Sequence, residues 1–472
     1  MTARRGWGRL VSAGTAVALF VLTAAPAVAA PQAPARAAEE TPTRTPIKHF
    51  VRLMQENHSF DNYFGSRPGV DGHPPDTCMP RHPATPERCI KPFHLGGRAI
   101  TDLDHTKRAF DEEYNGGKMD GFVLAHDREA KDGALAMGYY DDRDLPYYWN
   151  VADEYVLFDR FFSSSDSGSV RNHMYSVTGT PGATGKGESI PPQGWGALPT
   201  IFDRLEQKGI SWKFYVENYD SKITFRTRLT EEVDRGAQPI WVPLLSYARY
   251  VDDPRLSRHI VDLDQFYTDA ARGDLPAVSY IAPSGNSEHP PGSIQSGQRL
   301  TRALINQLMR SPLWSSTAFF WTYDDWGGWY DHVKPPQIDA YGYGFRVPAL
   351  LVSPYAKRGY VSHETNDFTS ILKFIEVNWG VAPLASRDRA ANPMLEAFDF
   401  SRPPRPPELL SLARNVQPEP RPNSVPVYLS YSGAVLLVGG LLALAQFVSR
   451  RRRRRRPAPG WSRLIPRQKV PR

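Results

Sequence analysis

The stretch that most constrains this chain spans residues 47–65 and reads IKHFVRLMQENHSFDNYFG. Its first half is dominated by apolar residues, and it then changes to the four polar residues Glu56-Asn57-His58-Ser59. In α/β enzymes, ligands bind outside the carboxyl ends of the strands, so an apolar strand that ends in such side chains is typical of a functional site. A core strand followed by a polar helix cap accounts for the same letters. We therefore predict a buried strand here, whose polar end is either part of a functional site or the cap of a following helix.

The remainder of the chain predicts an α/β fold with a mostly parallel central sheet flanked by helices on both faces. Apolar strand-like runs alternate with helical segments, and this alternation is typical of a parallel sheet that is covered on both sides. The strand candidates are 155–162, 210–217, 277–282, 317–323 and 347–352, and the helix candidates are 105–114, 145–154, 200–208, 262–271, 299–309 and 368–378.

The two ends predict an exported protein with one membrane anchor. Residues 1–29 place three arginines before an apolar run and an Ala-Val-Ala site, as a signal peptide does, and a flexible leader follows at 30–46. Residues 427–448 carry no charge and are long enough to cross a bilayer once, as a transmembrane helix. A Pro-rich stalk at 401–426 precedes this span.

The basic tail, residues 449–472, sets the expected orientation. Seven consecutive arginines follow Ser449, and such a cluster beside a membrane span marks the cytoplasmic side. We therefore expect a single-pass protein of the cell membrane, with its C-terminus in the cytoplasm. The main domain, residues 47–400, would then be extracellular.

The charge distribution excludes nucleic acid as the partner. The whole chain has a net charge of +7, from 57 Lys and Arg against 50 Asp and Glu. Fourteen of the basic residues lie in the first 30 residues and after Ser449, where no acidic residue occurs, which leaves 43 basic against 50 acidic residues elsewhere. The exported part is therefore acidic, and the excess of positive charge is a signal of topology.

Cys78 and Cys89 are the two cysteines of the chain and lie close together in a Pro-rich loop. In an oxidising compartment this spacing favours one disulfide. On the chain-entropy model, closing so short a loop stabilises the fold by roughly 3 kcal/mol. A metal site that uses both thiols is the alternative.

Four predicted strand ends carry polar residues that suit a single site. Glu, Asp and Asn offer oxygen ligands for a hard or borderline divalent cation, which can polarise a phosphoryl oxygen and activate a hydroxyl group. A serine at a helix start has free backbone N–H groups beside it, and a residue three positions later faces the same way. Strand caps, a solvated serine loop and a turn explain the same residues one by one. The residues are Glu56 and Asn57, Ser169 and Asn172, Glu288 and His289, and Asp324 and Asp325.

These residues lie in motifs that resemble the bacterial phosphoesterase family. That family groups non-haemolytic and haemolytic phospholipases C with a secreted acid phosphatase, and it belongs to the alkaline phosphatase superfamily. The resemblance implies an alkaline phosphatase-like fold and hydrolysis of phosphate esters with one divalent metal ion. The motifs occur in order from residue 47 to about residue 380 and read QENHSFDNYFG, NGGKMDGF, SVRN after a Phe-rich strand, EHPP, TYDDWGGWYDHV and RVPALLVSPYAKRGYVSH.

The resemblance also implies roles for single residues. Ser169 corresponds to the nucleophile, and Asn172 accompanies it. His105 and His289 correspond to the histidines that contact phosphate, although His105 is also placed to cap its own helix through nearby aspartates. A contribution from His332, in the DHV motif, stays open. The implied metal ligands are Glu56, Asn57, Asp324, Asp325 and Ser169.

The register of the nucleophile departs from the family pattern. A proline usually precedes the Asn of this motif, whereas here Val170-Arg171 stands between Ser169 and Asn172. The nearby serines Ser165 and Ser167 therefore remain rivals of Ser169 as the nucleophile.

The predicted function is hydrolysis of a phosphate ester through a phosphoserine intermediate. Phospholipid is one candidate substrate and a soluble phosphomonoester is the other. A catalytically inactive cell-surface binding or scaffold protein with the same fold is the alternative from another class. Aromatic residues between 323 and 343 have two interpretations, as a pocket for a choline-type cation or as core packing. They are Tyr323, Trp326, Trp329, Tyr330, Tyr341 and Tyr343.

Overall fold

The computed structural model describes residues 42–98, 100–128, 132–182, 189–227, 237–415 and 425–454. The predicted signal peptide and most of the leader lie outside these residues, as do 416–424 of the predicted stalk and 455–472 of the predicted tail. The assignments of those segments therefore stay predictions.

An eight-stranded mixed sheet forms the centre of the molecule, in the order β12-β6-β11-β10-β1-β9-β7-β8. The run from β10 to β8 is parallel throughout, so the predicted mostly parallel sheet is confirmed. The strands are β1 (His49–Gln55), β6 (Val156–Phe158), β7 (Trp212–Val216), β8 (Ile260–Asp262), β9 (Val278–Ala282), β10 (Thr317–Tyr323), β11 (Ala349–Val352) and β12 (Tyr360–Ser362).

Strand β11 is the exception, since it runs antiparallel to both β10 and β6. A parallel crossover normally needs a helix between the two strands. Residues 324–348 form turns and irregular structure without a helix, so the chain folds back beside β10 in the opposite direction. This helix-free connection carries the TYDDWGGWYDHV motif.

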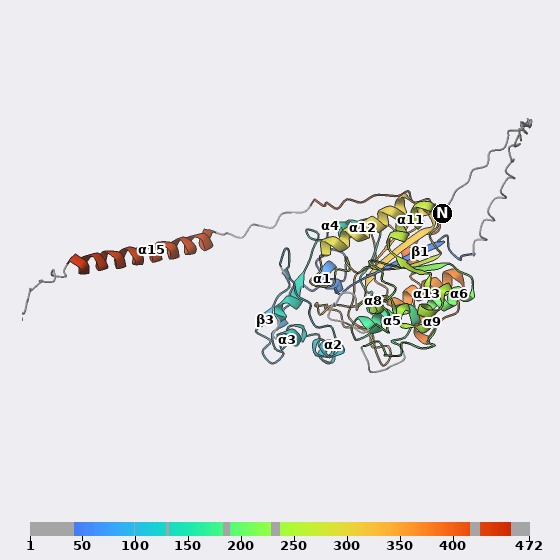
Figure 1. The fold of residues 1–472 in the computed structure, drawn as a ribbon, viewed down its shortest axis with the longest axis horizontal. Coiled ribbons are helices and arrows are strands. Elements are labelled where there is room, and N and C mark those ends of the chain that lie inside the picture. The colour runs from blue at the N-terminus through green and yellow to red at the C-terminus, as the bar shows by residue number, and fades with distance from the viewer. Residues whose placement is uncertain are drawn as a thin grey trace, which may run out of the picture.

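Helices cover both faces of the sheet, as expected. In Figure 1, α4, α11 and α12 lie on one side of the sheet, and α5, α6 and α13 lie on the other. The remaining helices are short and surround the sheet margins. The longer helices are α2 (Lys107–Tyr114), α3 (Phe122–Asp127), α4 (Pro146–Glu154), α5 (Ser169–Thr178), α6 (Ile201–Gln207), α11 (Asp264–Arg272), α12 (Ile294–Arg310) and α13 (Phe368–Trp379), and the shorter ones are α1 (Phe60–Phe64), α8 (Gln238–Trp241), α9 (Ala248–Asp252), α10 (Pro254–Ser257) and α14 (Ser386–Ala390).

Strand β1 lies in the interior of the sheet, between β9 and β10, and is buried from Phe50 to its end. Its register with β10 pairs Gln55 with Tyr323. Both strands stop at this pair, so Glu56 and Asp324 leave adjacent parallel strands side by side. The first predicted strand is therefore present, and its polar end lies at the same edge of the sheet as the acidic pair.

Two strands of the sheet were not predicted, β8 and β12. Each has three residues and lies at an edge of the sheet, where it pairs with a single neighbouring strand. Short edge strands have too little apolar periodicity to be recognised in a sequence. The predicted strand over 155–162 is likewise reduced to β6, because the chain leaves the sheet after Phe158.

The predicted disulfide between Cys78 and Cys89 is present, with the two Cα atoms 5.4 Å apart. It lies beside a small two-stranded sheet formed by β2 (Met79–Pro80) and β3 (Cys89–Ile90). A further small sheet pairs β4 (Phe93–His94) with β5 (Gly138–Tyr139). These two small sheets lie outside the main sheet.

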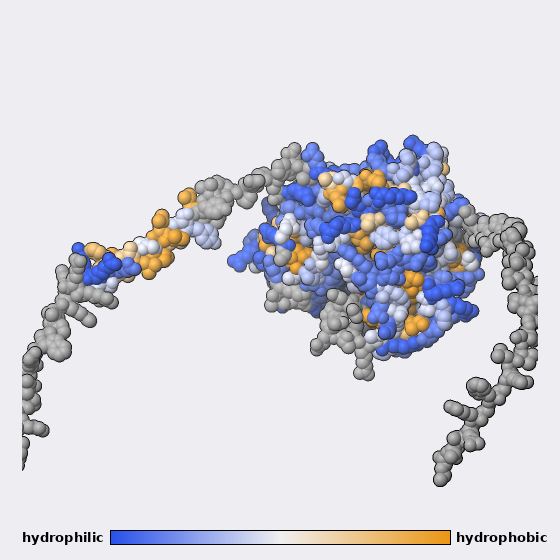
Figure 2. Space-filling model, turned by 45° about the horizontal axis from the view of Figure 1, so that its top comes forward, coloured by the Kyte–Doolittle hydropathy of each residue, from blue (hydrophilic) through white to orange (hydrophobic). Residues whose placement is uncertain are grey.

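Helix α15 (Val425–Arg454) contains the predicted membrane span. Its section Leu429–Arg451 is long and apolar enough to cross a membrane, and none of it is buried. Figure 2 shows apolar side chains along this helix and a hydrophilic end after them, while the body presents a mainly hydrophilic face. The structure thus contains one candidate C-terminal apolar helix among the described residues.

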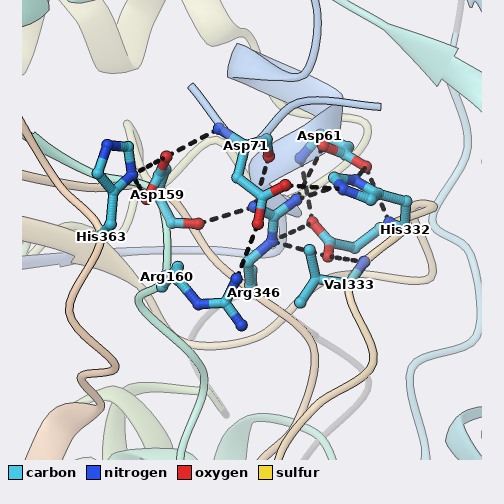
Figure 3. Close-up of polar contacts among 9 residues, drawn as sticks. Asp61, Asp71, Asp159, Arg160, His332, Val333, Arg346 and His363 are labelled. Carbon is cyan, nitrogen blue, oxygen red and sulfur yellow. Dashed lines mark hydrogen bonds and ion pairs between the residues drawn. The ribbon is translucent and has the colours of Figure 1, made fainter. Parts of the chain in front are cut away.

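A buried ion cluster ties the β10–β11 connection to α1 and to the loop at residue 71 (Figure 3). The guanidinium group of Arg346 is fully buried and lies 2.9 Å from Asp331 and 3.0 Å from Asp61. It also donates to the backbone carbonyl oxygens of Asp71 and Asp159. Four separate segments therefore depend on one side chain.

Replacing Arg346 by Gln should lower the free energy of unfolding by about 3–5 kcal/mol, because it leaves Asp61 and Asp331 buried without their counter-charge. Urea denaturation followed by circular dichroism measures the change. The matched control is Arg358→Gln, whose side chain is 69% exposed and pairs with Glu154. That change should cost less than about 1 kcal/mol. Equal losses in the two variants would contradict a special role for Arg346.

His332 makes the stability of this cluster depend on pH. Its ring lies 2.7 Å from Asp61 and 3.2 Å from Asp71. Burial alone would lower the pKa of His332, but the hydrogen bond and the charge of Asp61 outweigh it and raise the pKa above the ordinary value of 6.5. Burial raises the pKa of the neighbouring Asp331 to about 6, against the charge of Arg346.

A histidine whose pKa is raised on folding stabilises the protein fully below the unfolded pKa, and this stabilisation is lost as pH rises through the folded pKa. The free energy of unfolding should therefore fall as pH increases above about 6.5, where Asp331 is already ionised. The His332→Asn variant should lose this part of the pH dependence. Denaturation curves between pH 6 and pH 9 measure it, and an unchanged slope in the variant would rule out His332 as its source.

Candidate active site

The polar ends of β1 and β10 are held together by direct contacts. The backbone N–H of Asn57 donates to Asp324 Oδ1 at 3.2 Å. The turn that follows Asp325 packs against Asn57, since a Cβ atom at Gly327 would lie 2.3 Å from the Asn57 carbonyl oxygen. Gly327 also has a positive φ of 62°, so a side chain is disfavoured there on both counts.

The buried group formed by Glu56, Asp324 and His173 is the centre of the candidate site. One ligand atom from each lies within 4.8 Å of the others. His173 Nε2 is 3.0 Å from Glu56 Oε1 and 3.6 Å from Asp324 Oδ2. All three side chains are buried. The convergence expected for Glu56 and Asp324 is therefore observed, together with a histidine that sequence analysis missed.

A signal for His173 was present in the sequence. It lies four residues after Ser169 on α5, and residues spaced by four share one face of a helix. Once Ser169 is placed at the first position of that helix, the same face must carry His173 into the site.

Ser169 begins α5 and faces the acidic pair. Its hydroxyl donates to Asp325 Oδ2 at 3.2 Å. The side chain is partly buried, and the residue lies at a helix start, as one of the two interpretations of the serine-rich stretch expected. Of the rivals, Ser165 directs its hydroxyl to Asp166, and Ser167 is fully buried in the preceding turn. The geometry therefore favours Ser169 as the hydroxyl of the site.

Asn172 shares the α5 face of Ser169 but binds the turn before it. Its amide nitrogen donates to the carbonyl oxygens of Ser167 at 2.8 Å and Gly168 at 3.3 Å. These bonds hold the backbone that presents Ser169. Its Oδ1 atom is buried and has no hydrogen-bond partner in the part of the chain that the structure describes. Direct contact of Asn172 with a phosphoryl group stays a prediction.

The predicted histidines His105 and His289 lie together, with ring centroids 6.0 Å apart. Each ring places Nδ1 against a backbone carbonyl oxygen, at 2.9 Å from Leu103 for His105 and 2.8 Å from Pro290 for His289. Such contacts fix the proton on Nδ1 and leave Nε2 as an acceptor. Consistent with this, the Asn57 amide lies 3.3 Å from His105 Nε2.

Glu288, named with His289 in the sequence, does not point into the site. Its carboxyl group is buried and accepts hydrogen bonds from the hydroxyls of Tyr63, Tyr148 and Tyr323. Burial raises the pKa of Glu288 to about 7. This residue anchors the base of the loop that carries His289.

The site concentrates negative charge in a buried volume. Burial, together with the charges of Asp324 and Asp325, raises the pKa of Glu56 well above its ordinary value. Burial and the charge of Asp324 do the same to the pKa of Asp325. Burial also lowers the pKa of His173 to about 4, which keeps the imidazole neutral and able to act as a ligand.

The residues fit a divalent cation. Asn57 Oδ1 and Asp324 Oδ2 are buried and have no hydrogen-bond partner among the described residues. A buried polar atom without a partner is costly, and a cation would satisfy both oxygens and the surrounding negative charge. The oxygen donors, with one imidazole, form a ligand set that suits a hard or borderline metal.

The aromatic residues between 323 and 343 do not form a cation pocket. Tyr323, Trp326 and Trp329 are completely buried and pack within the core. Tyr341 and Tyr343 already face the guanidinium groups of Arg171 and Arg387, at 5.6 and 5.2 Å. The core interpretation therefore holds for Tyr323, Trp326 and Trp329, and Tyr330 is partly buried against the same core, whereas Tyr341 and Tyr343 are partly buried beside the two arginines. His332 lies in the Arg346 cluster and has no contact with Ser169 or the acidic pair among the interactions of the described chain.

The sequence model of the Phosphoesterase family matches residues 47–382 of this chain. The chain belongs to this family. The predicted class, a hydrolase that acts on phosphate esters, is thereby confirmed at the level of the family. The matched segment contains every residue of the candidate site, whose individual roles stay predictions.

The chain is similar in sequence to several phospholipases C. The chain is 30% identical over 446 residues to "Non-hemolytic phospholipase C" of Burkholderia pseudomallei, which covers 77% of this chain and 60% of that protein. It is 30% identical over 422 residues to "Phospholipase C A" of Mycobacterium tuberculosis, covering 76% and 78%. "Non-specific phospholipase C1" of Arabidopsis thaliana is 28% identical and covers 68% and 63%. The chain thus spans less than two thirds of some of these relatives.

Among solved structures, a protein in the alkaline phosphatase superfamily from Vibrio parahaemolyticus is similar with a TM-score of 0.35 and 13% identity. The match covers 73% of this chain and 69% of that one.

Removing divalent cations with EDTA should lower the melting temperature of the full chain by about 3–8 °C, because a ligand held only by the folded state stabilises it in proportion to its saturation. The Asp324→Ala variant should not respond to EDTA. The Asp269→Asn variant alters a carboxylate bonded to Lys213 and Tyr215, outside the site, and should respond like the wild type. Differential scanning fluorimetry measures all three, and an identical response of Asp324→Ala would contradict the metal site.

Proposed function

We propose that this protein is a metal-dependent phosphodiesterase of the phospholipase C type, with Ser169 as its nucleophile. The observation that carries the proposal is the contact between the Ser169 hydroxyl and Asp325, beside the buried group of Glu56, Asp324 and His173. The names of the curated relatives favour a phosphodiester over a phosphomonoester.

The metal would be held by the side chains of Glu56, Asn57, Asp324 and Asp325. His173 would be a further ligand, because its ring lies beside Glu56 and Asp324. A divalent cation there supplies positive charge to the Ser169 oxygen and to the phosphoryl oxygens. Asp325 accepts the hydrogen bond from Ser169 and so points its hydroxyl toward the acidic pair. The start of α5 adds free backbone N–H groups beside the same oxygen.

Ser169 attacks phosphorus in line, and the bond from phosphorus to the leaving alcohol breaks. His105 and His289 lie together, and His105 Nε2 lies beside the Asn57 amide nitrogen. In their protonated form the two rings would donate to the phosphoryl oxygens or to the leaving oxygen. Water then cleaves the phosphoserine and regenerates the hydroxyl. Asn172 keeps the Ser169 turn in place through its bonds to Ser167 and Gly168.

We further propose that the domain acts outside the cell, anchored by α15. The single candidate span among the described residues and the arginine cluster after it support this orientation. The second candidate function is the inactive scaffold. The complete set of ligand oxygens, two of them buried and unpaired, favours catalysis over it.

Replacing Ser169 by Ala should reduce turnover at least about a thousandfold, because the covalent route is lost. The full chain in detergent is assayed with p-nitrophenyl phosphorylcholine and with p-nitrophenyl phosphate, with and without added divalent cations. The matched controls are Ser165→Ala and Ser167→Ala, which should keep most of the activity.

Wild-type activity in Ser169→Ala would transfer the nucleophile to one of the two rivals. Absence of turnover by the wild type with either substrate and every metal would favour the scaffold. Faster turnover of p-nitrophenyl phosphate than of the choline diester would favour a phosphomonoesterase.

A further inference from the structure

Residues 402–415 lie as an extended strap on the surface of the body. This range contains no helix or strand. The strap follows α4 and α12, the two helices that cover one face of the sheet, and Figure 1 shows it passing over them. The described part of the predicted stalk is therefore bound to the body, and its path decides where the chain leaves the domain.

The strap is first fixed at the edge of the sheet where the parallel strands begin, which we call the amino edge. The indole N–H of Trp314, just before β10, donates to the carbonyl oxygen of Arg405 at 2.9 Å. The Arg405 guanidinium lies 3.0 Å from Glu154, at the end of α4 and just before β6. The candidate active site lies at the opposite edge, where the same strands end.

The strap then advances along the two helices toward the active-site edge. Arg302, in the middle of α12, donates to the carbonyl oxygen of Leu410 at 3.4 Å. Asn150, in the middle of α4, donates to the carbonyl oxygens of Ser411 and Ala413 at 3.0 and 3.2 Å. Helix α4 leads into the start of β6 and α12 leads into the start of β10, so both helices begin at the active-site edge.

The last contact of the strap is made by Arg414. Its guanidinium lies 3.3 Å from Asp142 and also pairs with Asp153. Asp142 belongs to the turn before α4, in which the backbone N–H of Tyr140 donates to the carbonyl oxygen of Asn62 at 2.7 Å. Asn62 lies in α1, which follows the polar end of β1. The strap therefore ends on the side of the domain that carries the candidate active site, and in Figure 1 it runs toward the side of α1.

The chain between the strap and α15 is short compared with the domain. Asn415 and Val425 are ten positions apart in the sequence, and ten residues of any conformation span at most about 36 Å. A domain of roughly 370 residues has a radius of gyration of about 21 Å and so a diameter of about 50 Å. With α15 in a bilayer, the end of the strap lies within this reach of the lipid surface. The active-site edge therefore cannot point straight away from the membrane.

Binding of the strap is what imposes this limit. If the chain were released from Arg405 onward, about 20 residues would reach about 70 Å, which exceeds the diameter of the domain. The strap is held at the surface by polar groups, including the stacking of Arg405 on the Tyr155 ring at 4.7 Å and of Arg414 on the Trp149 ring at 5.8 Å. Removing these arginines should loosen the strap and leave the core intact.

We propose that residues 402–415 are an orienting strap, which holds the active-site edge of the domain toward the bilayer that contains α15. The inference rests on the proposed function and its anchoring, and it adds the direction in which the site faces. The partner of this edge is the lipid surface of the protein's own membrane. The site would then act on esters presented at that surface rather than on those of an opposing membrane.

The test measures how close each edge of the domain lies to the lipid. The two cysteines of the chain form the disulfide, so one introduced cysteine is the only free thiol and can be labelled with a fluorescent donor. Gln295→Cys is exposed in the first turn of α12, at the active-site edge, and Ser315→Cys is exposed just before β10, at the amino edge. The full chain is reconstituted in phosphatidylcholine vesicles that contain a rhodamine-labelled lipid as the acceptor.

Energy transfer from position 295 should be at least about twice as efficient as from position 315, because the diameter of the domain separates the two edges. In the double variant Arg405→Ala/Arg414→Ala, this difference should fall to less than about half, since the longer free chain lets the domain turn. The matched control is Arg402→Ala, whose side chain is 82% exposed and pairs with Asp399, and it should behave like the wild type.

Equal transfer from the two positions, or more efficient transfer from position 315, would overturn the inference. An unchanged difference in the double variant would also overturn it, because the strap would then not set the orientation. A full chain that fails to float with the vesicles in a density gradient would overturn it as well, since α15 would not be in the bilayer.

These measurements need no turnover, so they separate failure of the strap from failure of the proposed function. Turnover of the soluble p-nitrophenyl phosphorylcholine should stay within about twofold in the double variant, because neither arginine contacts the candidate site. An active protein with equal transfer from the two edges overturns the strap alone. An inactive protein with the expected transfer supports the strap and contradicts the proposed function.

Discussion

The parallel pairing of β1 with β10 is the constraint on which the rest of the site depends. Gln55 and Tyr323 are partners in the register, and both strands end there. Because the strands are parallel, the residues that follow, Glu56 and Asp324, emerge at the same edge and from neighbouring positions. A shift of the register by one residue would exchange the two faces of the strand and separate these carboxylates.

Around that pair, the fold concentrates charge that is costly to bury. Glu56, Asp324 and Asp325 are almost completely enclosed, with the buried guanidinium of Arg52 among the nearby charges. Burial lowers the pKa of Arg52 to about 10, against the charges of Tyr280 and the carboxylates. Among the described residues, Asn57 Oδ1 and Asp324 Oδ2 are buried in this region without a hydrogen-bond partner, which suits oxygens that would bind a cation. Rigid packing elsewhere, including the Arg346 cluster, holds the segments that carry the site.

Tyr323, Trp326 and Trp329 are core residues rather than parts of a cation pocket. A cavity of about 530 Å³ lies on the other side of β1 from them, at the carboxyl ends of β7, β8 and β9. Its aromatic and acidic residues come from the ends of these strands and from α8. Helices and loops separate these segments in the chain, so their proximity follows from strand order.

The sequence by itself determined the fold class, the strands with continuous apolar runs, the disulfide and the polar strand ends. These follow from local pattern, since apolar periodicity and compartment act over short stretches. Only the tertiary structure showed that β11 runs antiparallel and that His173 lies beside Glu56. It also showed that Glu288 binds tyrosine hydroxyls instead of facing the site, and that His332 lies beside Asp61. Each of these depends on which distant segments meet, and that is set by strand order and packing across the sheet. No pattern within one stretch of the chain contains that information.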